Sequence, residues 1–196
     1  MTAKGTERAV FLDRDGCISP DQFGYISDPA GYSLYPYTGE ALRILRDLGY
    51  QLFVVTNQSG IARGYFDVPA LERVHKRLKE LLTAEGVKLA GLYYSPYFAE
   101  GIVRPYNRPH EDRKPGLGMF KRARREHPFD PGRSWMLGDR YSDVEFGKKA
   151  GLKTVLLLSG HGAHEMLFKL REHPYKPDFM AENLLTAARL IQMLHP

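Results

Sequence analysis

The sequence predicts an α/β fold in which a parallel sheet is covered by helices on both faces. Short apolar runs of strand length alternate along the chain with longer segments in which apolar residues recur at helical spacing. The short runs are continuously apolar, as in strands that are buried on both faces of a parallel sheet. In such sheets ligands bind beyond the carboxyl ends of the strands, so the residues that follow each run are the first candidates for a functional site.

The first three predicted elements are a strand, a helix and a strand. Residues 9–12 and 51–55 form the two strands. The helix between them begins with Thr38 as its capping residue. It ends at Gly49, because a glycine readily adopts the backbone conformation that stops a helix.

The alternation continues to the end of the chain and predicts a Rossmann-like sheet. Residues 95–113 are an exception, because they contain three prolines and no sustained periodicity, and long loops of this kind are often functional. The remaining predicted elements are helices from about Pro69 to Gly86, at 117–125 and at 142–150, strands at 91–94, 134–137 and 154–158, and a last pair of helices on either side of a short edge strand at 178–180.

We expect residues 1–196 to form a single domain, because this length suits one hydrophobic core. No apolar run approaches the length of about 18 residues that a membrane span needs, so we expect no membrane partner. Residues 1–8 contain no apolar segment typical of a secretion signal, and the single Cys17 allows no internal disulfide. We therefore expect a cytoplasmic protein, and we expect it to be a monomer.

The chain carries a formal net charge of +5, which suits an anionic partner without identifying it. The densest basic run, at 121–125, falls in a predicted helix, and we interpret it as a solvated face. No aromatic residues are interleaved in a basic groove, so we expect no nucleic-acid partner.

Polar residues, most of them carboxylates, follow the predicted strands, and one lysine ends the long loop. The residues concerned are Asp13 and Asp15 after the first strand, Thr56 and Asn57 after the second, Asp139 and Asp143 after the strand at 134–137, and Lys114 at the end of the long loop. Carboxylates that would repel one another, together with a lysine, are what a hard divalent cation and a phosphoryl group require. A carboxylate can also attack phosphorus and form an aspartyl phosphate, which divides hydrolysis into two easier steps.

Four segments around these residues resemble the four motifs of the haloacid dehalogenase superfamily of phosphatases, in the same order. They are Phe-Leu-Asp-Arg-Asp-Gly at 11–16, Val-Val-Thr-Asn at 54–57, Arg-Lys-Pro at 113–115 and Gly-Asp-Arg-Tyr-Ser-Asp at 138–143. Each segment alone could be an ordinary turn, cap or surface residue. All four in order, each after a strand or in the loop that faces the same sheet edge, favour the catalytic interpretation.

The resemblance implies a role for each residue. Asp13 would be the nucleophile, and Asp15 would protonate the leaving alkoxide and then activate water. Thr56 and Lys114 would hold the transferring phosphoryl group. The implied ligands of Mg²⁺ are Asp13, the backbone carbonyl of Asp15 and Asp139, with Asp143 as a further ligand or as a residue directly behind them.

Within the superfamily, residues 56–66 resemble the D-glycero-D-manno-heptose 1,7-bisphosphate 7-phosphatases, and the match extends from about 9 to 162. The resemblance implies a phosphorylated sugar as the small-molecule substrate, no large cap domain, and a role in making nucleotide-activated heptose for surface polysaccharide. It implies substrate contacts from Asp21, Gly24, Tyr25, Asn57, Gln58, Ser59, Arg113 and Arg140. Arg113 is the best candidate for the second phosphate, since a guanidinium can bind it through two hydrogen bonds.

The chain departs from the resemblance in two places. Cys17 stands where many relatives carry threonine, and we interpret it as a tolerated small residue. Relatives often hold the long loop with zinc, whereas the matching positions here are Ser95, Tyr97, His110 and Asp112, of which only the last two are good ligands. We therefore expect no structural zinc.

Three alternatives stay open at this stage. Histidinol-phosphate phosphatases share much of the same pattern. The phosphatase half of a nucleic-acid end-repair enzyme would suit the basic charge, but the chain contains no Walker A sequence. A catalytically silent phosphosugar-binding protein would not need the carboxylate pair Asp13 and Asp15.

Overall fold

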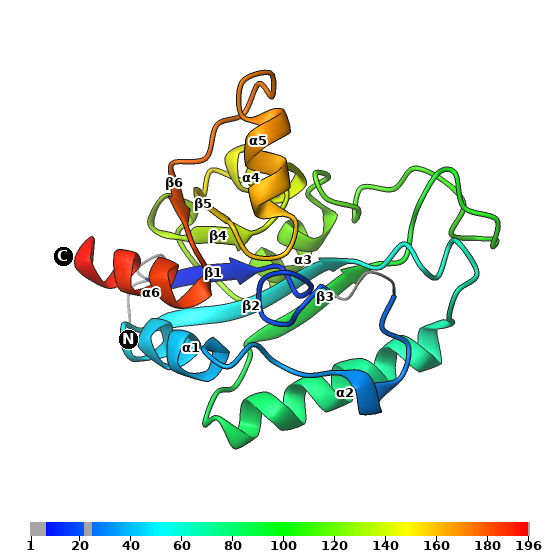
Figure 1. Ribbon diagram of the computed structural model, residues 1–196, viewed down its shortest axis with the longest axis horizontal. Coiled ribbons are helices and arrows are strands. Elements are labelled where there is room, and N and C mark those ends of the chain that lie inside the picture. Colours follow the sequence, from blue (N-terminus) through cyan, green and yellow to red (C-terminus); the bar gives the residue numbers. More distant parts are fainter. Residues whose placement is uncertain (1–6, 22–24, 196) are drawn as a thin grey trace.

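The centre of the computed structural model, which describes residues 7–21 and 25–195, is a six-stranded sheet. Its strand order is β3-β2-β1-β4-β5-β6, and all neighbouring strands are parallel (Figure 1). The strands are β1 (Arg8–Leu12), β2 (Tyr50–Asn57), β3 (Gly91–Ser95), β4 (Trp135–Gly138), β5 (Lys153–Leu157) and β6 (Phe179–Ala181). The predicted parallel sheet is confirmed, with β6 as the expected edge strand.

Six α-helices among the described residues connect and cover these strands. They are α1 (Thr38–Asp47), α2 (Val68–Ala84), α3 (Gly118–Glu126), α4 (Tyr141–Lys149), α5 (Gly162–Lys169) and α6 (Leu184–Met193). Helix α2 begins after Asp67, whose side chain accepts a hydrogen bond from the Ala70 amide at 2.8 Å, and Pro69 lies in its first turn. The predicted helices therefore lie where their patterns placed them, within a few residues at each end.

The predicted cap of α1 is wrong. Tyr37 occupies the capping position, and Thr38 lies inside the first turn, where it is fully buried. The Thr38 hydroxyl donates to the carbonyl of Ile18 at 2.7 Å instead of capping the helix. A buried hydroxyl needs a partner, and this partner comes from a distant segment that local sequence does not reveal.

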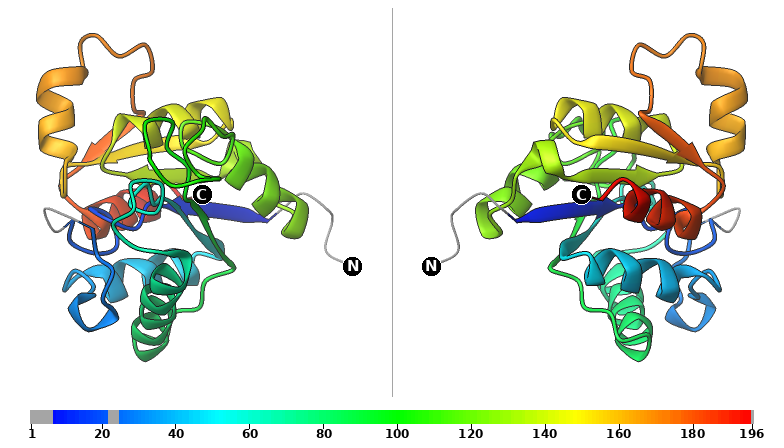
Figure 2. Two further views of the ribbon diagram at one scale, coloured as in Figure 1. Left: turned by 90° about the vertical axis from the view of Figure 1, so that its right-hand side faces the viewer. Right: turned by 90° about the vertical axis from the view of Figure 1, so that its left-hand side faces the viewer.

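The two largest apolar clusters among the described residues lie on opposite faces of the sheet. Val10 and Leu12 of β1 pack with apolar residues of α1, α2 and α6. Ala9 and Phe11, which point the other way, pack with residues of α3 and α4. Figure 2 shows the sheet lying between these two helical layers. This two-sided burial explains the unbroken apolar runs at 9–12, 52–55 and 155–157 within the strands.

The strand order reverses beside β1, and this reversal positions the site. The chain moves from β1 outward to β2 and β3, and then returns to place β4 on the other side of β1. The amide of Asp13 donates to the carbonyl of Leu137 at 3.0 Å, so the chain leaves β1 and β4 side by side. A switch point of this kind opens a crevice at the carboxyl ends of the strands, where ligands bind.

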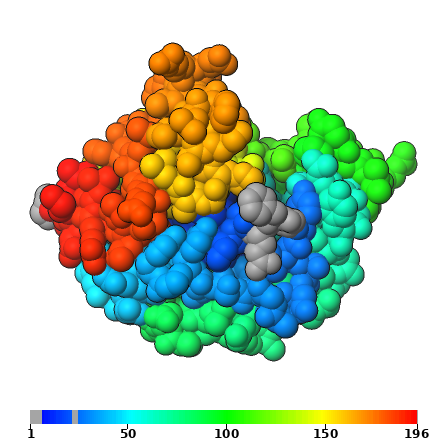
Figure 3. Space-filling view, viewed as in Figure 1, coloured from blue at the N-terminus to red at the C-terminus, as the bar shows by residue number. Residues whose placement is uncertain are grey.

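Loops and one short helix surround this crevice. The connection from β3 to α3 runs from 96 to 117 without a helix or strand, and α5 with the loop after it projects from the body of the molecule (Figures 1 and 3). Within the described ranges there is no large cap domain over the sheet. None of the described helices is long and apolar enough to cross a membrane.

Candidate active site

Three carboxylates meet at the switch point. Asp13 follows β1, Asp139 follows β4, and Asp143 lies in the first turn of α4. Each offers a carboxylate oxygen, and these oxygens all lie within 4.8 Å of one another. All three residues are buried. Their close approach concentrates negative charge in a largely buried site.

Glycines allow the backbone to come this close. Gly16 has a φ of +80°, and a Cβ atom on it would lie 2.2 Å from Asp139 Oδ2. A Cβ atom on Gly138 would lie 2.3 Å from Asp143 Oδ2. Both positions therefore require glycine, which explains why the first and fourth motif segments contain it.

Lys114 supplies the compensating positive charge. Its Nζ lies 3.0 Å from Asp13 Oδ1 and 2.6 Å from Asp143 Oδ1, and it donates to the carbonyl of Val55 at 2.7 Å. The amide side chain of Asn57 holds the lysine's backbone, since it donates to the Lys114 carbonyl at 3.1 Å and accepts from the Lys114 amide at 2.9 Å. In this structure Asn57 therefore positions Lys114, although the sequence assigned it to substrate.

Burial controls the protonation of this cluster. It raises the pKa of Asp139 well above its ordinary value, and the charges of Asp13 and Asp143 raise it further. Burial also raises the pKa of Asp143 to about 6, although Lys114 opposes the change. Burial alone would lower the pKa of Lys114, but Asp13 and Asp143 outweigh it and raise that pKa.

The cluster has the properties of a magnesium site. Asp139 Oδ2 accepts a hydrogen bond from the His161 amide at 2.7 Å, while Asp139 Oδ1 is buried and has no hydrogen-bond partner in the described part of the chain. One lysine cannot neutralise three carboxylates. Buried carboxylate oxygens in excess over cations match the oxygen ligands and charge that Mg²⁺ requires.

Asp15 is held on the other side of Asp13. Arg14 Nε donates to Asp15 Oδ1 at 2.9 Å, and Arg14 Nη2 donates to Asp15 Oδ2 at 2.8 Å. The Gln58 amide donates both to Asp15 Oδ2 at 2.9 Å and to the Thr56 hydroxyl at 2.8 Å. The sequence assigned Gln58 to substrate, and here it links the two residues assigned to acid–base chemistry and phosphoryl binding.

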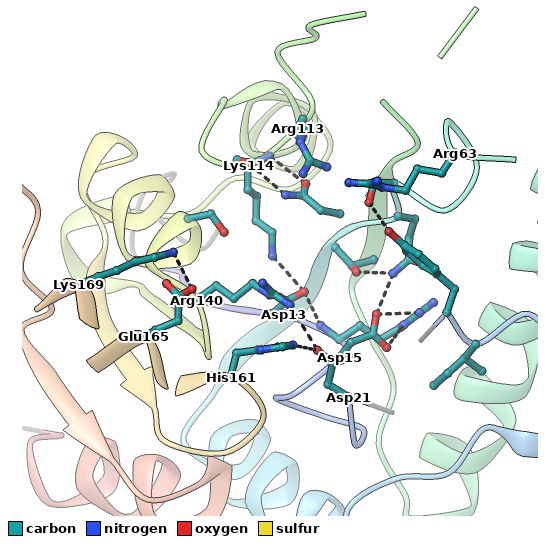
Figure 4. A pocket seen from close by; sticks show the side chains of 18 residues that line it. Asp13, Asp15, Asp21, Arg63, Arg113, Lys114, Arg140, His161, Glu165 and Lys169 are labelled. Carbon is teal, nitrogen blue, oxygen red and sulfur yellow. Dashed lines mark hydrogen bonds and ion pairs between the residues drawn. The ribbon is translucent and has the colours of Figure 1, made fainter. Parts of the chain in front are cut away.

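A pocket of about 610 Å³ opens above these groups. Figure 4 shows Lys114 pointing toward Asp13 at its floor. Asp139 and Asp143 are not part of the lining and are buried beside Asp13. Gly24 lies outside the described residues. The remaining residues that the sequence assigned to catalysis and substrate all line the pocket, namely Asp13, Asp15, Asp21, Tyr25, Thr56, Asn57, Gln58, Ser59, Arg113, Lys114 and Arg140.

Comparison with known proteins identifies the family. A family model described as HAD-hydrolase-like matches residues 112–187. The chain is 36% identical to a D-glycero-D-manno-heptose-1,7-bisphosphate 7-phosphatase of Thermosynechococcus vestitus, over 93% of this chain and 94% of that one. It is 40% identical to the D-glycero-beta-D-manno-heptose-1,7-bisphosphate 7-phosphatase of Haemophilus ducreyi, over 78% of this chain and 83% of that one.

The chain belongs to the heptose bisphosphate phosphatase family of haloacid dehalogenase-like hydrolases. The fold agrees with this assignment. The crystal structure of a D,D-heptose 1,7-bisphosphate phosphatase from B. bronchiseptica, complexed with magnesium and phosphate, superposes with a TM-score of 0.81 at 24% identity. The superposition covers 96% of this chain and 99% of that one.

Against this family background, the structure adds pocket residues that the sequence did not single out. The most informative is Arg63, whose guanidinium carbon lies 4.0 Å from the centre of the Phe98 ring. The guanidinium carbon of Arg113 lies 5.0 Å from the same ring. Arg63 falls within the segment that carries the family resemblance, but that resemblance assigned it no role.

The two loops that carry these arginines are joined by their backbones. The carbonyl of Ala62 accepts hydrogen bonds from the amides of Ile102 at 2.7 Å and Val103 at 2.9 Å. Arg113 Nη1 also donates to the carbonyl of Tyr97 at 3.3 Å. Burial lowers the pKa of Arg113, and the charges of Arg63 and Arg140 lower it further. The arginines are therefore held together in spite of their repulsion.

The opposite wall of the pocket contains residues from α5 and the turn before it. His161, Glu165 and Lys169 line this wall, and Figure 4 shows them across the pocket from Arg63 and Arg113. His161 Nε2 lies 2.7 Å from Asp21 Oδ2, and Arg140 Nη2 lies 3.5 Å from the same oxygen. The sequence assigned none of these three residues a role. Glu165 and Lys169 lie after Gly162, where the family resemblance ends, and His161 lies at the end of the matched range.

The two departures from the family pattern have clear local structures. Cys17 is fully buried, and burial together with the nearby carboxylates raises the pKa of its thiol well above the ordinary value. In the long loop, the rings of Tyr97 and His110 stack with centroids 3.8 Å apart. Asp112 Oδ2 lies 3.7 Å from His110 Nδ1 and 3.4 Å from Arg122 Nη2.

Proposed function

We propose that the chain is a Mg²⁺-dependent phosphatase that removes the 7-phosphate of D-glycero-D-manno-heptose 1,7-bisphosphate through a phosphoaspartate at Asp13. The observation that carries the proposal is the position of Asp13. Its carboxylate reaches the pocket floor, 3.0 Å from Lys114 Nζ and beside the buried carboxylates of Asp139 and Asp143. Family membership makes the chain a phosphatase, and the substrate named for the relatives suggests the sugar.

In the first step Asp13 attacks the phosphorus, and a new bond forms between its carboxylate oxygen and the phosphorus. The bond to the sugar oxygen breaks, and Asp15 gives that oxygen a proton. In the second step a water molecule transfers a proton to Asp15 and attacks the phosphorus. The bond between phosphorus and the Asp13 oxygen breaks, inorganic phosphate leaves, and the Asp13 carboxylate and the protonated Asp15 are regenerated.

The surrounding residues orient these steps. Lys114 and the Thr56 hydroxyl would hold the phosphoryl oxygens in line for attack. When bound by Asp13, the Asp15 carbonyl and Asp139, Mg²⁺ would supply the charge that offsets the phosphoryl oxygens. The position of Asp143, paired with Lys114, suits a residue that orients the lysine and contributes negative charge behind the ligands.

The second phosphate would bind near Arg63 and Arg113. Within the described residues neither side chain makes an ion pair, and Phe98 supports both. Two neighbouring guanidiniums that form no ion pair among the described residues are suited to a dianion, which each can bind through two hydrogen bonds. This feature favours a bisphosphate over histidinol phosphate, which has a single phosphate.

Further parts of the proposal concern partners and location. We propose that residues 1–196 act as a single-domain monomer in the cytoplasm, with a small phosphorylated sugar as substrate and no nucleic-acid or membrane partner. In support, the basic run of α3 is partly neutralised, since Lys121 pairs with Glu111 at 2.7 Å and Arg122 with Asp112 at 3.4 Å. Sedimentation of the purified protein tests whether it is a monomer. Cell fractionation tests whether it is in the cytoplasm.

The substrate is tested by phosphate release from a panel of esters. The panel contains heptose 1,7-bisphosphate, fructose 1,6-bisphosphate, histidinol phosphate and a 3′-phosphorylated oligonucleotide, each with and without Mg²⁺. We expect the largest kcat/KM for heptose 1,7-bisphosphate, and none without the metal. A preference for histidinol phosphate or the oligonucleotide would overturn the substrate assignment and leave the phosphatase assignment intact.

A further inference from the structure

Arg14, which lies between the two catalytic aspartates, is an unusually restricted arginine. Its side chain is 1% exposed, and its guanidinium donates to both oxygens of Asp15. The Arg14 guanidinium lies over the Tyr32 ring, with its carbon 5.6 Å from the ring centre. A guanidinium that makes two parallel hydrogen bonds fixes the plane of the carboxylate it binds. The orientation of Asp15 therefore depends on what fixes Arg14.

A histidine from α2 holds the remaining end of Arg14. His75 Nε2 lies 3.1 Å from Arg14 Nη1. His75 is 5% exposed, and it belongs to the buried face of the 17-residue helix α2 together with Val74 and Leu78. Because this helix packs against the sheet, it provides a rigid support for a side chain that reaches toward the site.

The direction of this hydrogen bond follows from charge. A guanidinium only donates, so His75 Nε2 must accept and cannot carry a proton. Burial is the main cause that lowers the pKa of His75 to about 3, and the positive charge of Arg14 contributes to the same shift. His75 is thus neutral, with its proton on Nδ1, over the range in which the chain would function.

We propose that His75 is a positioning residue for the reaction. By accepting from Arg14 it fixes the guanidinium that orients Asp15, so that a helix residue far away in sequence controls the acid–base carboxylate. The inference rests on the proposed function, in which Asp15 protonates the leaving oxygen.

The hydrogen bonds also determine which oxygen of Asp15 is able to carry the proton. In the described part of the chain, Oδ2 accepts from Arg14 and from Gln58, whereas Oδ1 accepts from Arg14 alone. A carboxylate oxygen has two lone pairs, so Oδ1 keeps one of them for a proton. Loss of the contact from His75 would release the guanidinium and remove this distinction.

The test compares leaving groups. A sugar alkoxide needs a proton as it leaves, whereas the phenolate of p-nitrophenyl phosphate leaves without one. The kcat/KM value for each ester covers only the steps through formation of the phosphoaspartate, so it excludes the later activation of water. A variant that disturbs the acid should therefore lower kcat/KM for the sugar ester more than for the aryl ester.

The variants separate the hydrogen bond from packing. We expect His75→Leu, which cannot accept, to lower kcat/KM for heptose 1,7-bisphosphate by about 10- to 100-fold, and for p-nitrophenyl phosphate by less than about threefold. His75→Gln presents an oxygen where Nε2 stood and should restore most of the sugar activity. Leu78→Ala, one turn along the same buried face, should weaken the helix and leave the ratio of the two kcat/KM values unchanged.

Two results would overturn the proposal. One is an equal loss on both esters in His75→Leu, and the other is a His75→Gln variant as impaired as His75→Leu. If His75→Leu does not fold, His75→Met takes its place, because a thioether is only a weak acceptor and should give the same selective loss. A wild-type protein that hydrolyses neither ester would instead contradict the proposed function.

Discussion

Lys114 Nζ lies 2.6 Å from Asp143 Oδ1 and only slightly farther, 3.0 Å, from Asp13 Oδ1. One buried cation is thus shared by the proposed nucleophile and by a carboxylate from a different motif segment. Through this shared contact, the segments at 113–115 and 138–143 both influence the charge and position of Asp13 in the segment at 11–16. Removing the lysine would leave two buried carboxylates without their partner, which is far more costly than losing a surface ion pair.

We expect Lys114→Met to lower the free energy of unfolding by about 3–5 kcal/mol in magnesium-free buffer. Urea unfolding in the presence of a chelator measures it. Lys121→Met is the matched control, because Lys121 pairs with Glu111 at the exposed surface and its loss should lower the free energy of unfolding far less than the loss of Lys114. Added Mg²⁺ should stabilise the Lys114 variant more than the wild type. A loss below about 1 kcal/mol would show that the pairing contributes little.

Asp13→Asn should abolish phosphate release and leave the fold intact, because an amide is a poor nucleophile and loses the charge that attracts Mg²⁺. Steady-state assays with heptose 1,7-bisphosphate, together with circular dichroism, measure both properties. Asp47→Asn, at an exposed position next to Arg46, should behave like the wild type. Substantial magnesium-dependent turnover in Asp13→Asn would be incompatible with a phosphoaspartate at this residue.

The arginine pair makes a prediction about specificity. Arg63→Ala and Arg113→Ala should each lower kcat/KM for heptose 1,7-bisphosphate by about 10- to 100-fold, the usual effect of losing charged hydrogen bonds. Activity on p-nitrophenyl phosphate, which has no second phosphate, should change by less than about threefold. Arg43→Ala, an exposed arginine paired with Glu85, serves as the control. Equal losses on both substrates would place these arginines at the reacting phosphate instead.

The long loop should contain no stoichiometric zinc. Serine and tyrosine hydroxyls at 95 and 97 replace good ligands, and the Tyr97 ring instead stacks on His110. Elemental analysis of the purified protein measures the metal directly. Activity should survive zinc-selective chelation and disappear when Mg²⁺ is removed. About one zinc per chain, lost in His110→Ala or Asp112→Ala, would show that the remaining ligands suffice.

His75 should make the fold sensitive to acid. Its pKa is about 3 in the folded protein and about 6.5 in an unfolded chain, so below about pH 6.5 the unfolded state binds the extra proton. Stability therefore falls as pH falls from about 6.5 toward 3, by up to about 1.4 kcal/mol per pH unit from this residue. Urea unfolding of the wild type and His75→Gln at pH 7 and pH 5 should show a flatter dependence in the variant. Parallel dependences would contradict the cause assigned to the shift.

The sequence predicted the fold and the centre of the site well, because the relevant signals are local. Apolar runs marked the strands, and the binding of ligands at the carboxyl ends of parallel strands predicted that Asp13 and Asp139 lie together. The parallel sheet, the family and the phosphatase assignment are all confirmed by the fold and the relatives. The roles of individual site residues stay predictions.

What the sequence did not reveal depends on contacts between distant segments. The cap of α1 was wrong because Thr38 is bonded to Ile18. The hydrogen bond between Arg14 and His75 joins positions 61 residues apart. The pocket wall formed by α5 lies in a segment without a family motif. Arg63 is the exception, since it lay within a recognised segment and could have been considered as a charged residue without an assigned role.

The loop that carries Arg63 and the loop that carries Arg113 are joined by backbone hydrogen bonds from Ile102 and Val103 to the Ala62 carbonyl. This connection bears on how substrate choice can change in such enzymes. The carboxylates to which we assign the chemistry, Asp13 and Asp139, follow the central strands β1 and β4. Arg63 and Arg113 lie instead on peripheral loops whose backbones are hydrogen-bonded to each other. Substitutions at positions 63 and 113 can therefore change which second group of a substrate binds, while Asp13, Asp139 and Lys114 keep their places.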